Sequence, residues 1–77
     1  MTKINCYYRR SLKMSADKQS AQVAHVVANL TRNKIPTEIS VNAVGDDKFA
    51  ELENTPRCYV QCDNGVETVL GLWEREE

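Results

Sequence analysis

A long amphipathic segment between two short alternating ones constrains this chain most. Residues 3–8 alternate apolar and polar side chains with the period of two that is typical of a β-strand, and residues 37–44 do the same. Between them, an apolar stripe at helical spacing predicts a helix from about 16 to 33, with Ser15 as its N-cap. Strands joined by so long a crossover are parallel, so we expect a right-handed β–α–β unit.

The second half of the chain predicts a short helix and a β-hairpin. Its expected elements are a two-turn helix capped by Asp46 or Asp47 and ended by Asn54, a Thr55-Pro56 step, a third strand over 57–62 and a fourth over 66–73. The Asn64-Gly65 pair predicts the hairpin turn, since both residues tolerate positive φ. With only 77 residues, we expect one α/β domain, 1–77, of βαβαββ order with a four-stranded mixed sheet.

Charge is unevenly distributed along the chain. Residues 1–34 hold seven Lys or Arg against one acid, a net of +6, whereas residues 35–77 carry a net of −7. The two halves can pair internally, or head to tail with another copy, so a homodimer is a candidate assembly. With 42% hydrophobic and 27% charged residues the chain is globular, and no apolar run is long enough for a membrane span.

The three cysteines predict neither a disulfide framework nor a metal site. Cys6, Cys58 and Cys62 are odd in number and lack a Cys-x-x-Cys or Cys/His spacing. We interpret them as small core side chains with reduced thiols, which indicates a cytoplasmic protein.

The order of the elements resembles a minimal thioredoxin-fold domain of the glutaredoxin-like family. The opening strand 3–8, the loop Arg9 to Met14 that leads into the long helix, and the passage 54–60 around Thr55-Pro56 carry this likeness. In that family a cis proline precedes the third strand, so the resemblance implies a cis Pro56. The family also places Cys-x-x-Cys or Cys-x-x-Ser before the first helix. This chain has Ser11-Leu12-Lys13-Met14 there, so the likeness is to a degenerate member without dithiol chemistry.

If the family fold holds, it implies a binding site where the basic loop meets the proline corner. Arg9, Arg10, Ser11 and Lys13 would lie beside the N-terminus of the long helix, which attracts anions. Thr55 resembles the residue that pairs its backbone with glutathione in relatives, next to Pro56. Glutathione, an acidic peptide segment or a phosphate would fit this arrangement, and we expect no other cofactor.

A second candidate surface is the sheet face that lacks the family's final helix. Its expected residues are Lys3, Asn5, Tyr7, Ser40, Asn42, Tyr59, Gln61, Val69 and Trp73. Of these, Tyr7, Tyr59 and Trp73 are the candidate interface residues, because aromatic side chains are favoured at protein interfaces.

Three classes of function remain open from the sequence. The first is a non-catalytic binding or regulatory module that docks a protein partner or an anionic ligand at these surfaces. The second is a glutathione- or thiol-dependent oxidoreductase that uses Cys6, Cys58 or Ser11. The third is a nucleic-acid-binding protein with Tyr7 and Tyr8 as stacking groups, against which the pI of about 5.8 counts. We favour the first class, and therefore expect a protein partner rather than an enzyme.

Overall fold

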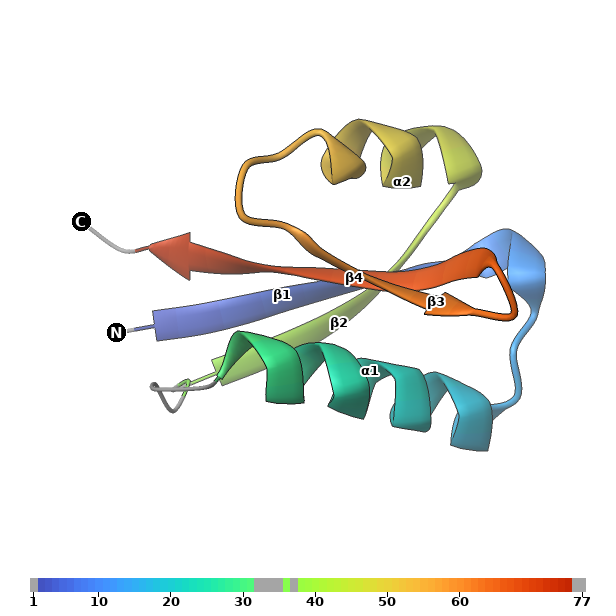
Figure 1. The fold of residues 1–77 in the computed structure, drawn as a ribbon, viewed down its shortest axis with the longest axis horizontal. Coiled ribbons are helices and arrows are strands. Elements are labelled where there is room, and N and C mark those ends of the chain that lie inside the picture. The colour runs from blue at the N-terminus through green and yellow to red at the C-terminus, as the bar shows by residue number, and fades with distance from the viewer. Residues whose placement is uncertain (1, 32–35, 37, 76–77) are drawn as a thin grey trace.

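A four-stranded sheet lies between two helices, as the computed structural model shows (Figure 1). The structure describes residues 2–31, 36 and 38–75. Its elements are β1 (Thr2–Arg9), the 3₁₀ turn η1 (Arg10–Leu12), α1 (Ala16–Leu30), β2 (Glu38–Val44), α2 (Asp46–Glu53), β3 (Tyr59–Asp63) and β4 (Val66–Arg75). The predicted α/β class and βαβαββ order are confirmed. The predicted end of the first helix at 33 and the start of the second strand at 37 lie outside the described residues.

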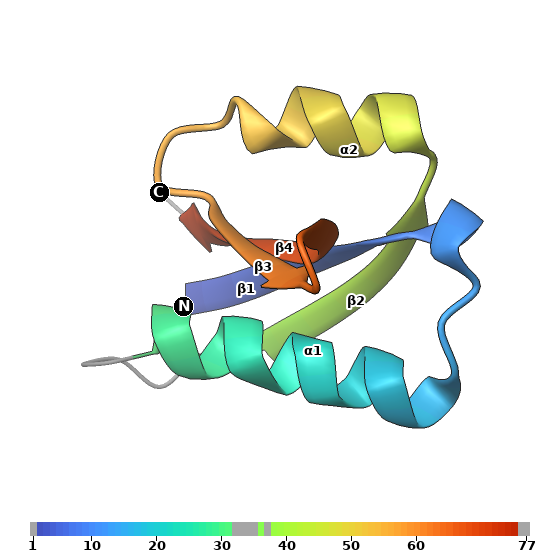
Figure 2. The same cartoon turned by 45° about the vertical axis from the view of Figure 1, so that its right-hand side comes forward.

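The sheet is mixed, with the strand order β2-β1-β4-β3. β1 and β2 are parallel, in a register that pairs Lys3 with Glu38 and Arg9 with Val44. β4 runs antiparallel to both β1 and β3. The crossover through α1 therefore joins parallel strands as predicted, and the closing hairpin inserts its second strand beside β1 (Figure 2).

The main core lies between α1 and the sheet. Ile4 and Cys6 of β1, Val26 of α1 and Val69 of β4 are fully buried there. The indole Nε1 of Trp73 donates a hydrogen bond to the Leu30 carbonyl oxygen at the end of α1, with an N–O distance of 3.1 Å. Burial of these apolar groups supplies most of the driving force that holds α1 on the sheet.

A smaller core lies on the opposite face, under α2. Phe49 of α2 is only 2% exposed, and Leu70 of β4 is fully buried. The Arg9 guanidinium lies 5.8 Å from the centre of the Phe49 ring, within the range of a cation–π contact. Gly45, not Asp46 or Asp47, is the N-cap of α2; both aspartates lie in the first turn, where the helix dipole favours their charge.

The hairpin turn is confirmed, but the third strand begins later than predicted. Asn64 and Gly65 have φ values of 53° and 80°. Arg57 has a φ of 65°, in the left-handed region and outside the β region, and β3 starts at Tyr59 rather than at 57. A register shift then leaves Thr68 of β4 as an extra residue, because Gln61 pairs with Val69 and Cys62 with Glu67.

The predicted aromatic face is wrong, because its members lie on two different faces. Val69 and Trp73 stand opposite Tyr8 and Ile4 in the register of β4 with β1, and residues directly opposite share a face. Tyr59 packs against the same core under α1. Tyr7 lies on the other side, with the rest of the predicted polar face in β1 and β2. By the register of β3 with β4, Gln61 also belongs to the face under α1.

Candidate functional site

The structure does not bring the basic loop and the proline corner together. Arg9 contacts Asp46 in the first turn of α2, whereas Thr55 follows its C-cap, Asn54. The intervening helix of eight residues spans about 12 Å at the usual rise per residue. Figures 1 and 2 both show the two segments at opposite ends of the sheet. The expected pocket between them is therefore wrong.

The backbone at Thr55 and Pro56 also differs from what the resemblance implies. No peptide bond among the described residues is cis, so the bond before Pro56 is trans. The Thr55 N–H donates to the Leu52 carbonyl at 3.0 Å, and the Thr55 carbonyl accepts from the Cys58 N–H at 3.3 Å. Both backbone groups of Thr55 thus serve the turn that leads out of α2, not a ligand.

Arg9 and Ser11 have a structural role that the sequence did not reveal. The Ser11 hydroxyl donates to the Asp46 carboxylate at 2.6 Å, and the Arg9 Nε donates to the same oxygen at 3.1 Å. These hydrogen bonds, from Ser11 first and then Arg9, lower the pKa of Asp46. Arg9 also donates to the Glu67 carbonyl at 3.1 Å. The two side chains therefore fasten the start of α2 and the hairpin to the end of β1.

Arg10 and Lys13 are the cations of the predicted site that lie on the surface. Arg10 is exposed and donates to the Ala43 carbonyl across 3.4 Å, a long hydrogen bond. Lys13 is exposed, in a left-handed conformation with a φ of 48°. The basic loop is thus divided into two residues that hold the fold together and two that face solvent.

The opposite charges of the two halves pair within the chain. Lys3 lies 3.5 Å from Glu38 and 3.9 Å from Glu74, and Lys18 lies 2.7 Å from Asp63. Together with Arg9 and Asp46, these pairs all join the basic first half to the acidic second half. Internal pairing, one of the two arrangements that the sequence left open, is thus present in the structure.

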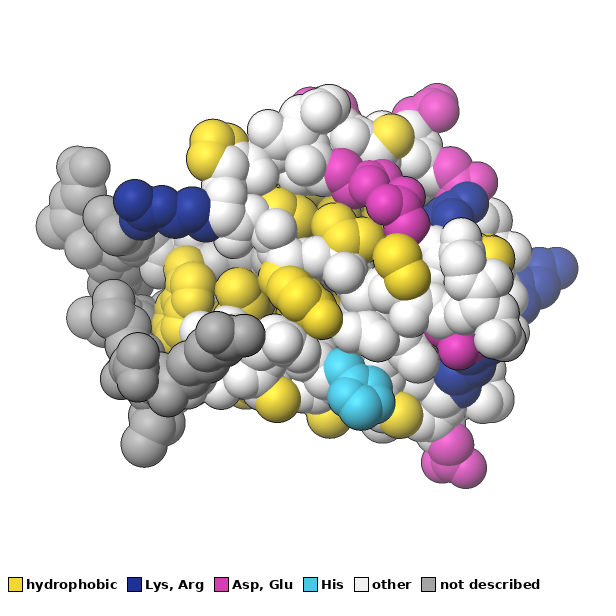
Figure 3. All heavy atoms as spheres, in the orientation of Figure 1, with side chains coloured by type: hydrophobic (Ala, Val, Ile, Leu, Met, Phe, Trp, Pro, Cys, Tyr) yellow, Lys and Arg dark blue, Asp and Glu magenta, His cyan; other side chains and the backbone are white. Residues whose placement is uncertain are grey.

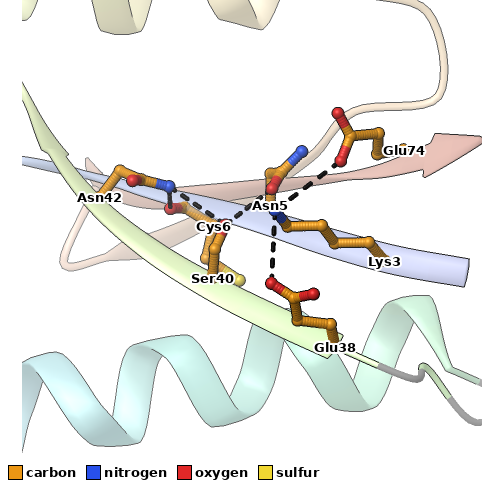
Figure 4. Close-up of polar contacts among 7 residues, drawn as sticks. All are labelled: Lys3, Asn5, Cys6, Glu38, Ser40, Asn42 and Glu74. Atoms are coloured by element: carbon orange, nitrogen blue, oxygen red, sulfur yellow. Dashed lines mark hydrogen bonds and ion pairs between the residues drawn. The ribbon is translucent and has the colours of Figure 1, made fainter.

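A polar network covers the α2 side of β1 and β2 (Figure 4). The Ser40 hydroxyl donates to the Asn5 amide oxygen at 2.6 Å, and the Asn42 amide donates to the Ser40 oxygen at 3.2 Å. Asn42 also reaches the Cys6 carbonyl at 3.4 Å. These side chains satisfy one another's hydrogen-bonding groups along the two strands, next to the ion pairs of Lys3.

The two thiols that are buried or partly buried, Cys6 and Cys58, have raised pKa values and are therefore not activated as nucleophiles. Burial raises the pKa of Cys6 to about 11, and burial together with the nearby charge of Glu53 raises the pKa of Cys58. Cys62 is exposed, and all three cysteines are free. The described part of the chain holds no group of three or more His, Cys, Asp or Glu arranged for a metal ion. None of the described helices is long and apolar enough to cross a membrane.

Glu53 and Glu67 form a carboxyl pair where α2 faces the hairpin. The hydrogen bond between them, followed by partial burial and the Glu67 charge, raises the pKa of Glu53. Such a pair is stable while it shares a proton and becomes repulsive when both groups ionise.

The described residues also form an apolar groove that sequence reasoning missed. It lies between α1 and β2, has a volume of about 420 Å³, and is lined by Gln19, Ser20, Val23, Ala24, Val27, Ile39 and Val41. Ile39 and Val41 are 44% and 45% exposed, although their alternation resembles that of a buried strand. Within the described residues, α1 packs mainly over β4, β3 and β1, so it covers these two side chains of β2 only in part.

The two edges of the sheet differ in how they are protected. β3 has five residues, lies at a register shift and ends in Asp63, which pairs with Lys18. Figure 3 shows this side, where hydrophobic side chains lie between the two helices and acidic groups border them. β2 has seven residues in unbroken register with β1, and contains no Pro, Lys or Arg. Bulges, short strands and inward charges are the usual protection against pairing with other chains, and β2 has none of them.

The comparisons with known proteins identify no relative. No protein-family model, curated protein or solved structure matches this chain. The resemblance to the glutaredoxin-like family therefore stays a prediction, and the trans bond before Pro56 does not support it.

Proposed function

We propose that this chain is a non-catalytic protein-binding module that takes an extended segment of its partner along the free edge of β2. The observation that carries this proposal is the pair Ile39 and Val41, nearly half exposed on an unprotected edge strand beside an apolar groove. In this mode of binding, an extended peptide adds to the sheet edge as a further strand. Its main-chain hydrogen bonds provide affinity, and its alternate side chains provide specificity.

The surroundings of β2 define the chemistry of the segment. On one face, its side chains would meet Ile39, Val41 and a groove whose α1 residues carry no charge. On the other face, they would meet Ser40 and Asn42 of the polar network. The favoured partner is therefore a strand that alternates β-branched or other apolar residues with small polar ones.

The other two classes of function receive less support. The raised pKa values of Cys6 and Cys58 disfavour a thiolate nucleophile at either position. For nucleic-acid binding, Lys3, Arg9 and Lys18 are engaged in internal ion pairs. Protein docking remains the function that the surface favours. The proposed docking site is now the β2 edge, and no longer the basic loop that the sequence suggested.

The proposal is tested by selecting binders from a phage-displayed library of random peptides. We expect the selected peptides to alternate apolar and polar residues. Amide chemical-shift changes on binding should concentrate in β2 and the groove side of α1. Changes centred on residues 9–13 or 54–58 instead would overturn the proposal.

A matched pair of variants sharpens this test. Val41→Lys places a charge on the β2 edge and should abolish binding of the selected peptides. Val66→Lys changes a valine of similar exposure, 42% against 45%, at the start of β4, which β1 separates from β2, and should bind as the native chain does. Equal binding by both variants would also contradict the proposal.

A further inference from the structure

We infer that the strand received by β2 is the β2 strand of a second copy, so that two chains form a symmetric dimer with one continuous sheet. This inference rests on the proposed function, because it uses the same edge and names the occupant. It adds the register, the symmetry and the contacts between the two copies.

The sequence of β2 is complementary to itself when two copies run antiparallel and centre on Val41. In that register Val41 faces Val41 of the partner subunit, and Ile39 faces Ala43 of the partner subunit, a large residue against a small one. Ser40 faces Asn42 of the partner subunit, the same two residue types that already share a hydrogen bond of 3.2 Å within the strand. In this register the five central residues, 39–43, pair apolar with apolar and polar with polar, and at the two ends Glu38 faces Val44 of the partner subunit.

The two-fold symmetry places equivalent helices of the two copies on the same face of the continuous sheet. A two-fold axis perpendicular to the sheet leaves both α1 helices on one face and both α2 helices on the other. The two apolar grooves then adjoin across the axis, with Ile39 and Val41 of both copies as their common floor. The contact is isologous and closed, so it ends at the dimer instead of continuing as a fibre.

Charge at this edge does not oppose the pairing of two identical strands. Glu38 is the one charged residue of β2, and it lies 3.5 Å from Lys3 of its own chain. In the register centred on Val41, the two Glu38 residues are six positions apart along the strands, roughly 20 Å. The groove residues of α1 carry no charge. The proposed register therefore keeps the two Glu38 carboxylates apart.

The small size of the domain favours this additional burial. Six hydrophobic residues of the described chain are fully or almost fully buried: Ile4, Cys6, Val26, Phe49, Val69 and Leu70. A domain of this size buries only about 60% of its unfolded surface, so covering Ile39 and Val41 in a dimer is a substantial gain.

Sedimentation equilibrium of the full chain across a dilution series tests the inference. We expect a mass of twice 8.7 kDa that falls toward 8.7 kDa on dilution. Val41→Lys should be monomeric throughout while keeping the native circular dichroism spectrum, and Val66→Lys should dimerise as the native chain does. A native chain that is monomeric at every concentration overturns the inference, as does a Val41→Lys chain that still dimerises.

Oxidative cross-linking tests the register independently of stability. In a background of Cys58→Ser and Cys62→Ser, Val41→Cys should give a covalent dimer, whereas Val66→Cys should not. Cross-linking only at position 66 would contradict the inference. A monomeric chain whose selected peptides still map to β2 would overturn the dimer and leave the proposed function standing. Peptides that map elsewhere would overturn the proposed function itself.

Discussion

Gly71 of β4 lies so close to Val26 of α1 that a Cβ at position 71 would overlap the Val26 side chain. The same Cβ would lie 3.0 Å from the Leu30 Cδ1. This close approach lets α1 pack tightly onto β4. Ile39 and Val41 of β2, at the edge of the sheet, remain nearly half exposed in this arrangement.

Replacing Gly71 with alanine should therefore destabilise the protein. Overpacking of a close contact costs about 1–3 kcal/mol, and we expect a loss of that size in the free energy of unfolding, measured with urea. Gly45→Ala is the control, because nothing lies within 4 Å of a Cβ at that position. Its cost should be below about 1 kcal/mol, since it only weakens an N-cap. An equal loss in both variants would contradict the role of close packing.

The same glycine explains which part of the fold could be predicted from the sequence. Alternation and helical spacing predicted the elements and the parallel pair correctly, because those patterns are local. These patterns did not determine which face of β4 packs against α1. Leu70 and Leu72 alternate with Val69 and Trp73, and both sets of side chains are apolar. In the structure, Val69 and Trp73 share the α1 face with Gly71, whose missing Cβ leaves room for Val26.

The candidate site was less predictable, because it depends on how the strands are ordered. β2 is an edge strand because the hairpin adds to the opposite side of β1, and no described strand pairs with the other side of β2. No local pattern in residues 38–44 encodes that order. Similarly, the separation of Arg9 from Thr55 depends on the direction of α2 across the sheet, which composition and spacing do not specify.

Arg9 and Arg10 should differ sharply in their effect on stability, although they are neighbours in a basic cluster. Arg9→Ala removes contacts to the Asp46 carboxylate, the Glu67 carbonyl and the Phe49 ring. We expect a loss of about 2 kcal/mol, the range for a charge-assisted hydrogen bond in a partly buried setting. Arg10→Ala removes one long, exposed hydrogen bond and should cost less than about 0.5 kcal/mol. Urea unfolding of the two variants measures the difference, and similar values would show that Arg9 is not the anchor of α2.

Glu53 should make the stability of the protein depend on pH. Its pKa is raised above the ordinary 4.5 by Glu67, so the protonated form is favoured in the folded state. The stabilising contribution is therefore fully present below about pH 4.5 and is lost as pH rises through the folded-state pKa. We expect Glu53→Gln to raise the unfolding temperature at pH 7 and to have little effect at pH 4, as followed by circular dichroism. Glu51→Gln, on the same helix, should not show this pH dependence; a gain at both pH values for Glu53→Gln would rule out the shared proton.

The three thiols should react with iodoacetamide in the order of their exposure. Cys62 is exposed and should be alkylated first, Cys58 is half-buried with a raised pKa, and Cys6 is buried with a pKa of about 11. Because the thiolate is the reacting species, Cys6 should remain unmodified in the native protein at pH 8 and react only after unfolding in urea. Mass spectrometry of peptides taken along a time course gives the order directly, and the urea-unfolded chain, in which all three react at similar rates, is the control. Rapid alkylation of Cys58 or Cys6 at a pH well below 8 would reveal an activated thiolate and would support a thiol-dependent oxidoreductase instead of a binding module.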